Sequence, residues 1–263
     1  MGKLLWCEWA KLKRRPLFQI AALTSVVLPI LFLPYLKSQG TDADATDAMM
    51  DVLRTESGFL LLIPLLVILA SNLLFEEHDN DTLKNLVCVP ISKGRLVVAK
   101  LGLLLLFSLA YLMVGYLFGV LALTLAGWKV DGWLFQLWLT AGTGVLLWAA
   151  ALPCVLLAVW LNKSSIITVV LAFFYTMANY ILGISSNMMM MPMGLNAGTL
   201  LPVPLLKRWL FQYHVMRPGS EGAQLYAQLS PYFVTPAQAF AVLGAEAAVC
   251  LLLIVWVYRR QEN

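Results

Sequence analysis

The stretch best equipped for chemistry is the segment EEHDND at residues 76–81. It holds Glu76, Glu77, His78, Asp79 and Asp81, which are residue types that bind metals or transfer protons. An intramembrane metalloprotease would need such ligands to converge from several helices at one level. The sequence has one other histidine, at position 214, and no second group of acids and histidines accompanies it. The pattern therefore argues against an intramembrane enzyme.

A short helix is predicted to follow this segment directly. Asn80 and Asp81 can cap its first turn. Leu83, Leu86 and Val87 are spaced i, i+3 and i+4, so they share one face. Because such a stripe has no core of its own, it requires a membrane surface or the groove of a partner protein to cover it.

Pro90 is predicted to end this helix, since proline cannot continue the helical hydrogen bonding. Ser92 can then cap a second helix that runs through Lys93 and Lys100 into the next apolar run. The region 76–100 is thus predicted to place a short polar helix between two long apolar ones.

The rest of the chain is predominantly apolar. Of its 263 residues, 61% are hydrophobic and only 12% are charged, against about 25% charged in average soluble domains. A membrane-spanning helix needs about 20 mostly apolar residues. The sequence therefore predicts one all-α integral membrane domain over residues 1–263, with six spans at 17–36, 58–75, 101–126, 134–161, 166–186 and 237–258.

The first apolar run could instead belong to a cleaved signal peptide, because ADA at residues 43–45 resembles a cleavage site. The run is longer than the apolar part of typical signal peptides and ends well before that site. We therefore treat it as a span.

The basic residues indicate the orientation of the spans. If the N-terminus lies inside, 12 of the 18 Lys and Arg residues fall on the inner side, and KLKRR at residues 11–15 adjoins the first span. This bias predicts that both termini are cytosolic. The net charge of +4 is spread over the span ends rather than gathered in one patch, which gives no support for a nucleic-acid partner.

Residues 1–16 are predicted to form an amphipathic helix in the inner membrane interface. Leu5, Trp9 and Leu12 are spaced i, i+4 and i+7, and Trp6 and Trp9 would lie at the depth of the lipid headgroups. A plain basic stop before the first span is the alternative. The basic side chains that would face anionic lipid are Lys11, Lys13, Arg14 and Arg15.

Two outer segments are long. Residues 37–57 are acidic, and residues 187–236 contain short apolar pieces at 200–206 and 209–215, broken by Pro202, Pro204 and Pro218. These pieces are too short to span a bilayer. We expect short extracellular helices that lie on or dip into the outer leaflet and pack on the bundle.

Two polar residues are candidates for translocation or gating. Glu246 is the only acid well inside a predicted span, where a charge is costly; it could contact cargo or be a protonated structural residue. Asn179 lies one turn from Tyr175 in the fifth span, and hydrogen bonding between helices is the favoured role.

The methionines at 188–193 raise the question of a Cu(I) site, since thioethers suit that ion. No cysteine lies near them in the sequence. We therefore favour adaptable apolar packing and predict no metal site.

The region 76–100 resembles the coupling-helix region of ABC-2 type transporter permeases, most closely the group that serves bacitracin and lantibiotic self-protection. Asp81 stands where that family usually has glycine. The order of six spans, the N-terminal helix and the short outer helices also resemble the family. The matching residues are Glu76 or Glu77, Thr82, Leu83, Lys84, Asn85, Leu86, Pro90, Ile91, Ser92, Lys93 and Lys100.

This resemblance implies the permease subunit of an exporter in the bacterial cytoplasmic membrane. Two permease copies, or this chain and a relative, would pair, and each would seat residues 82–89 on a separate ATPase subunit. The chain has no GxxxxGK[ST] phosphate loop, so we expect it to be non-catalytic and to bind no cofactor, with ATP and Mg²⁺ on the ATPase.

The implied cargo is an amphiphilic peptide antibiotic, lantibiotic or bacitracin-like, or a related lipid-like compound. A permease for another cargo, such as a lipid, a polysaccharide or a metal-related compound, is one alternative. A membrane channel or scaffold without an energy source is the other, and co-purification with an ATPase would separate it from a transporter.

Overall fold

The computed structural model describes residues 2–13, 16–38, 45–79, 93–130, 132–161, 165–214 and 221–261. This part of the chain contains six helices that are long and apolar enough to cross a membrane, which confirms the predicted all-α fold with six spans. They are α2 (Pro16–Ser38), the continuous helix α3 (Ala45–Asp51), η1 (Val52–Leu62) and α4 (Ile63–Asp79), then α6 (Lys93–Leu125), α7 (Trp133–Leu161), α8 (Ser165–Ile184) and α13 (Pro236–Gln261).

The helix α7 is the centre of the bundle and packs against α4, α6 and α13. Small residues allow the close approach of α6: a Cβ atom on Gly144 would lie 3.4 Å from the Cα atom of Leu109. The Ser108 hydroxyl donates a hydrogen bond of 2.7 Å to the Gly144 carbonyl. Backbone approach at small residues, with hydroxyl bonds across the interface, is the usual basis of helix packing in a membrane.

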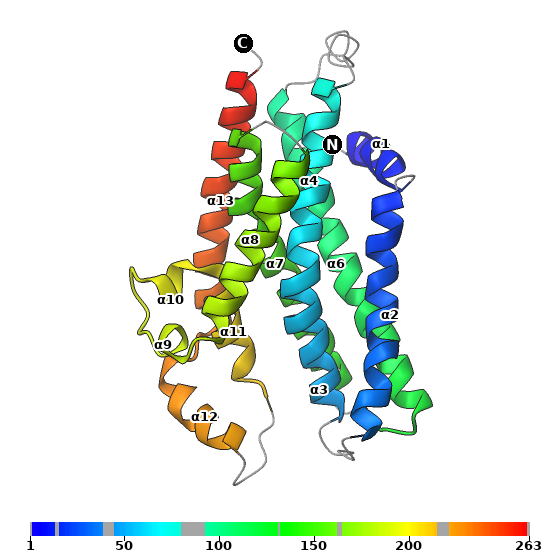
Figure 1. The fold of residues 1–263 in the computed structure, drawn as a ribbon, viewed down its shortest axis with the longest axis vertical. Helices are drawn as coiled ribbons and strands as arrows, with labels where there is room; N and C mark the ends of the chain where they lie inside the picture. Colours follow the sequence, from blue (N-terminus) through cyan, green and yellow to red (C-terminus); the bar gives the residue numbers. More distant parts are fainter. Residues whose placement is uncertain are drawn as a thin grey trace.

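Both termini lie at the same end of the bundle (Figure 1), as expected for an even number of spans. We refer to this as the terminal end and to the opposite end as the far end. The short helices α9 (Ser186–Met189), α10 (Ala197–Leu200), α11 (Pro202–Phe211), α12 (Glu221–Leu229) and η2 (Ser230–Tyr232) cover one side of the bundle toward the far end (Figure 1).

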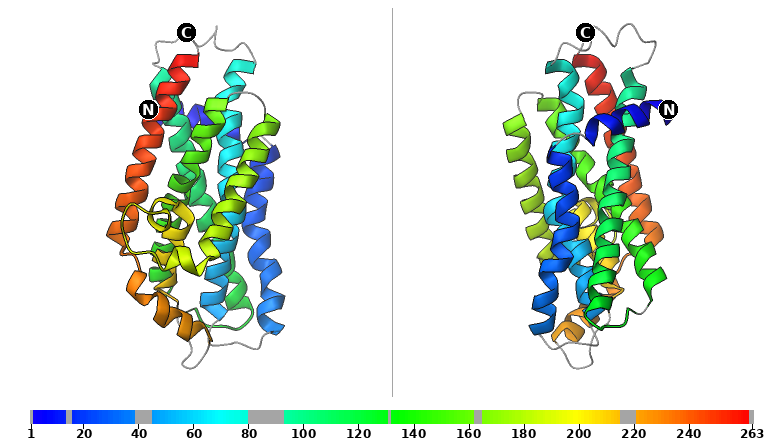
Figure 2. Two further views of the ribbon diagram at one scale, coloured as in Figure 1. Left: turned by 60° about the vertical axis from the view of Figure 1, so that its left-hand side comes forward. Right: turned by 90° about the vertical axis from the view of Figure 1, so that its right-hand side faces the viewer.

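A helix is present in the predicted N-terminal segment: α1 (Gly2–Leu12) lies across the bundle at the terminal end (Figure 2). Leu12 is fully buried, and the Trp9 ring packs edge-on against Phe18 with ring centroids 5.5 Å apart. Trp6 is 73% exposed. Part of the predicted apolar face therefore packs on the bundle of this chain, while Trp6 points outward.

The predicted basic face of α1 is only partly described. Lys11 is exposed and pairs at 2.7 Å with the buried Glu8 carboxylate, one turn away. Lys13 is exposed. Arg14 and Arg15 lie outside the described residues.

The helix that contains the second span begins earlier than predicted. We expected an acidic loop up to residue 57 and a span over 58–75, but the helix already begins at Ala45. Met49, Met50 and Leu53 are buried at helical spacing and pack with Leu36 and Leu123. Asp47 and Asp51 lie on the same helix and are partly exposed, so an acidic composition did not prevent a helix here.

Pro202 and Pro204 were predicted to break the outer apolar pieces. Pro202 does so, because α10 ends at Leu200 and Leu201 is extended, whereas Pro204 lies within a helix. Pro202 begins α11, which contains residues 202–206 of the first piece and 209–211 of the second. The first four N–H groups of a helix have no partner within it, so proline is tolerated there. α11 packs against α8, α13 and α7, which confirms the expected packing on the bundle.

Candidate functional site

The predicted coupling residues Thr82, Leu83, Lys84, Asn85, Leu86, Val87 and Pro90 lie outside the described part of the chain. Glu76 and Glu77 belong to the last turns of α4, and their side chains are not described. The two helices that flank the segment, α4 and α6, both reach the terminal end of the bundle (Figure 1). The segment therefore connects two spans at that end.

Lys100 links these two flanking helices near the terminal end. Its side chain is 1% exposed, and its Nζ atom donates a hydrogen bond to the carbonyl of Leu73 on α4. On the next residue of α6, the carbonyl of Leu101 accepts a bond of 3.0 Å from the Trp148 indole of α7. Hydrogen bonds therefore connect α4, α6 and α7 near the terminal end.

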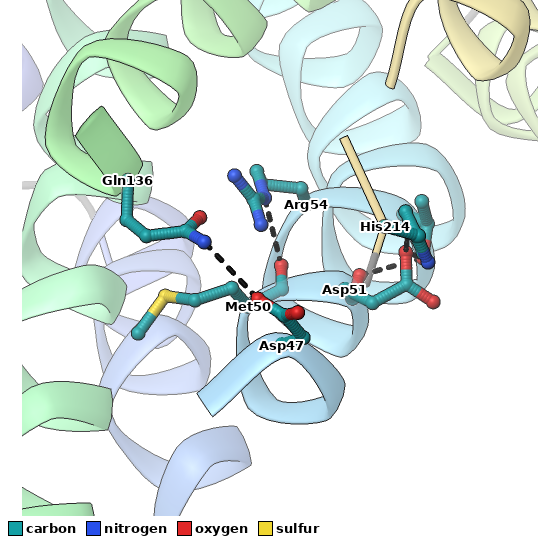
Figure 3. Close-up of polar contacts among 7 residues, drawn as sticks. Asp47, Met50, Asp51, Arg54, Gln136 and His214 are labelled. Carbon is teal, nitrogen blue, oxygen red and sulfur yellow. Dashed lines mark hydrogen bonds and ion pairs between the residues drawn. The ribbon is translucent and has the colours of Figure 1, made fainter. Parts of the chain in front are cut away.

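At the far end, five polar residues from three parts of the chain meet (Figure 3). Gln136 of α7 donates a hydrogen bond of 3.2 Å from Nε2 to Oδ1 of Asp47. His214, which follows α11, places Nε2 at 3.2 Å from Oδ1 of Asp51. With Arg54 between the two contacts, we refer to these residues as the far-end polar cluster.

Arg54 is the buried cation of this cluster. It is 6% exposed, and its Nε atom donates to the carbonyl of Met50 at 3.0 Å. Its Nη1 atom has no hydrogen-bond partner among the described residues. The carboxylates of Asp51 and Asp47 interact with it electrostatically, which compensates for part of the cost of removing the charge from water.

The helix that carries the cluster has an uncommon backbone. η1 is a π-helix of 11 residues, whereas π-helical hydrogen bonding usually occurs as single turns, often at functional sites. The hydroxyl of Thr55 bonds back to the carbonyl of Asp51 at 2.6 Å. Bonds of this kind from Thr and Arg side chains to carbonyls one turn earlier accompany the π-helical segment.

The sequence analysis missed this cluster. It placed Asp47, Asp51 and Glu56 in a loop and took Glu246 as the only acid well inside a span. The structure corrects the predicted loop, because all three acids lie on the continuous helix that leads into the second span. The signal was the spacing of Asp47, Asp51 and Arg54 at i, i+4 and i+7, which puts them on one helical face.

A cavity of about 210 Å³ adjoins the cluster, and we refer to it as the far-end pocket. It is bounded by the second span, the end of α8, and the helices α11 and α12. Charged groups and apolar side chains both line it. They are Asp51, Thr55, Glu56, Gly183, Ile184, Met189, Lys207, Leu210, Phe211, His214, Leu225 and Leu229.

Lys207 of α11 is the cation of the far-end pocket. Its Nζ atom lies 4.6 Å from the ring centroid of Tyr180 and 5.7 Å from that of Phe59, within the range of cation–π attraction. Burial lowers the pKa of Lys207 below its usual value, and the carboxylates of Glu56 and Asp51 oppose part of that shift. The Tyr180 hydroxyl donates to Oε2 of Glu56 at 2.7 Å.

The predicted candidate Glu246 lines a different cavity, of about 430 Å³, between α7, α8 and α13. We refer to it as the lateral cavity. Apart from Glu246 and the hydroxyl of Tyr175, its side chains are apolar or sulfur-containing. They belong to Pro153, Leu200, Leu201, Pro202, Ala245, Val249 and Cys250.

Asn179 does not share this cavity with Glu246. It is 4% exposed, and its Nδ2 atom donates to the carbonyl of Tyr175 in the same helix at 3.0 Å. The expected bond between helices is made by Tyr175, whose hydroxyl donates to the Ala150 carbonyl of α7 at 2.7 Å. Tyr175 therefore lies beside both predicted candidates, since it accepts a hydrogen bond from Asn179 and lines the same cavity as Glu246.

Within the described ranges, no three His, Cys, Asp or Glu side chains converge as a metal site would require. The methionine segment instead packs against α10: a Cβ atom on Gly198 would lie 2.9 Å from Cβ of Met191 and 2.5 Å from the carbonyl oxygen of Met188. Met189 is buried and lines the far-end pocket.

These features define a multi-pass, all-helical membrane protein in which one connection between spans at the terminal end is flanked by α4 and α6. Residues 4–179 match the family described as ABC-2 family transporter protein. The match covers more than half of the chain, and the chain belongs to that family. It is thus a membrane permease component of an ABC transporter, and the family implies an ABC ATPase as partner in general. No curated protein matched the sequence.

Proposed function

We propose that this permease exports a cationic amphiphilic compound out of the membrane, such as a lantibiotic or bacitracin-like peptide. The lateral cavity is the observation that carries the proposal. It presents apolar side chains on the flank of the bundle around the carboxylate of Glu246. An apolar surface with one acid suits a molecule with an apolar body and a positive charge, because the cation can pair where water is scarce.

The burial of Glu246 supports a role for its charge. The side chain is only partly exposed, and a carboxylate at this depth of a span is costly unless it is paired or protonated. No hydrogen bond or ion pair within the described residues engages it. A cationic cargo would supply the missing partner.

The proposed energy source is a separate ATPase that binds ATP and Mg²⁺. Residues 82–89 would dock on it as the coupling helix, through Leu83, Leu86 and Val87. The bond between Lys100 and Leu73 supports this proposal, because it ties together the two helices that flank the segment. A push on the segment would then move α4 and α6 as one unit, as alternating access by rocking of helix bundles requires.

In this proposal the terminal end faces the cytosol of a bacterial cell and the far end faces outward. The excess of Lys and Arg at the terminal end supports this orientation. Two permeases, either identical or related, would pair in the membrane, each with one ATPase subunit.

The test is the sensitivity of cells to membrane-active peptides. Cells with the chain and its ATPase should tolerate a lantibiotic or bacitracin at several-fold higher concentration than cells with an inactive ATPase. Glu246→Gln should remove most of that protection, whereas Glu246→Asp, which keeps the charge, should retain it. Unchanged sensitivity to every such peptide would contradict the proposed cargo and favour another ABC-2 cargo.

A second measurement separates a transporter from a channel or scaffold. The chain is purified from native membranes and its partners are identified. A transporter should co-purify with an ABC ATPase whose activity rises when the cargo is added. Recovery of the chain without any ATPase would contradict an ATP-driven mechanism.

A further inference from the structure

The far-end pocket contains both positive and negative side chains. Some of their polar atoms make no hydrogen bond within the described residues. Lys207 Nζ faces two aromatic rings, and no acceptor within the described ranges lies within hydrogen-bond distance of it. Asp51 uses Oδ1 for His214 and Thr55, which leaves Oδ2. Glu56 uses Oε2 for Tyr180, which leaves Oε1. A ligand in this pocket could therefore meet one cation and two carboxylate oxygens.

We propose that the far-end pocket binds the phosphoethanolamine headgroup of a membrane lipid. Lys207 would pair with the phosphate, and the free oxygens of Asp51 and Glu56 would accept hydrogen bonds from the primary ammonium group. Ammonium and phosphate joined by two carbons match a pocket in which opposite charges are neighbours. Charge-assisted bonds of this kind are roughly twice as strong as neutral ones.

The size of the pocket favours a headgroup over a complete small molecule. Sites for drug-sized ligands have volumes of about 300–1,000 Å³, whereas this pocket has about 210 Å³. A drug-sized ligand or a whole lipid would therefore place only part of itself in the pocket.

The depth of the pocket is that of lipid headgroups. Gly183 and Ile184, which line it, are the last residues of α8 and of the candidate span Ile166–Ile184. The candidate span Ala45–Phe75 has 31 residues, and about 20 suffice to cross the hydrocarbon. Counting back from Phe75 places Glu56 at the hydrocarbon boundary and Asp51 beyond it.

An apolar path leads from the pocket toward the membrane interior and explains why a lipid is favoured over a soluble phosphate compound. Ile184 is 56% exposed, and exposed apolar side chains continue at helical spacing along the same face of α8. Acyl chains could lie along this stripe while the headgroup occupies the pocket. The other members of the stripe are Val170, Phe174, Met177 and Ile181.

This inference depends on the chain lying in a membrane and not on the exported cargo, so the cargo tests above can fail without affecting it. The test is native mass spectrometry of the full chain in mild detergent. It is supplied with phosphatidylethanolamine, phosphatidylcholine and phosphatidylglycerol of equal acyl chains. We expect wild type to retain phosphatidylethanolamine about tenfold more than the others, since one lost charge-assisted bond costs about that factor.

Variants of the pocket residues test whether the preference for phosphatidylethanolamine comes from the far-end pocket. Lys207→Gln should lower retention of phosphatidylethanolamine about tenfold, and Lys207→Arg should restore it because the cation is kept. The double variant Asp51→Asn with Glu56→Gln should remove the preference over phosphatidylglycerol. Lys129→Gln changes an exposed lysine outside the pocket and should leave retention at the wild-type value.

Three results would overturn the inference. Equal retention of all three lipids by wild type would mean that no headgroup is selected. Unchanged retention by both Lys207→Gln and the double variant would place the lipid elsewhere. Displacement of the lipid by an equimolar amount of soluble O-phosphoethanolamine would show that the acyl chains contribute nothing, and that the ligand is a free compound.

Discussion

Nε2 of His214 lies 3.2 Å from Oδ1 of Asp51, and this contact joins the end of the α11 segment to the junction of α3 and η1. The ring of Phe211 stacks on His214 with centroids 5.1 Å apart and restricts its orientation. The segment that ends α11 and the helix of the second span are thus attached by a polar contact at the rim of the far-end pocket. A change in the position of α11 would alter the pocket and the start of the span together.

Removing this contact should loosen the far end without unfolding the bundle. We expect His214→Ala to lower the free energy of unfolding by about 0.5–1 kcal/mol, because both side chains are partly exposed and solvent screens them. Thermal unfolding of the detergent-solubilised chain measures this. Gln224→Ala on the exposed face of α12 is the control, and an equal loss in both variants would contradict a specific role for His214.

Substitution of Arg54 should lower the free energy of unfolding more than substitution of His214, because Arg54 is buried. Arg54→Met removes the charge between Asp47 and Asp51 and the bond to the Met50 carbonyl. We expect a loss of about 2 kcal/mol in unfolding free energy, which is typical of a buried hydrogen bond to a charged group. Arg54→Lys should recover part of it in the same thermal assay. A methionine variant as stable as wild type would mean that the two acids do not need the cation.

Tyr111 connects three helices within the bundle. Its hydroxyl lies 3.1 Å from Ser57 Oγ on η1 and 3.1 Å from Thr24 Oγ1 on α2. Tyr111→Phe removes both contacts with little change in volume and should cost about 1 kcal/mol. Ser57→Ala should cost less, since Tyr111 keeps the contact with Thr24. A larger loss for Ser57→Ala would contradict this order in the thermal assay.

Lys100 is expected to affect the coupling between cargo and ATP hydrolysis rather than the insertion of the chain into the membrane. Lys100→Met keeps an apolar side chain of similar length but releases the Leu73 carbonyl. If α4 and α6 must move as one unit, cargo should no longer stimulate ATP hydrolysis in the complex, while the amount of chain in the membrane stays unchanged. Arg95→Met, on the exposed side of the same helix, is the matched control. Full stimulation in Lys100→Met would rule out this link.

The proposed coupling helix at residues 82–89 can be tested directly. Leu86→Asp places a charge on the predicted docking face and should abolish cargo-stimulated ATP hydrolysis without loss of insertion. A charge at Leu83 should do the same. Cysteines placed on this helix and in the cleft of the ATPase should cross-link in native vesicles. Normal stimulation in Leu86→Asp, or a cross-link that never forms, would refute the assignment.

The sequence by itself determined the number and type of the membrane-crossing elements. In a bilayer no water is available to the backbone, so each helix must satisfy its own N–H and C=O groups. Length and apolar composition then suffice to find it, and all six were found. The sequence predicted the start of a helix less well where the helix carries polar residues, as at Asp47 and Asp51. The acidic composition of that segment is typical of a loop, whereas the spacing of its residues indicates a helix.

Only the tertiary structure decided which polar groups meet. Asp51 with His214, Glu56 with Tyr180, and Lys100 with Leu73 come from segments far apart in the chain. Each pair depends on how two helices are rotated and shifted relative to one another, and side-chain packing between helices sets that arrangement. Local periodicity specifies the face of one helix and contains no information about the neighbour that covers it.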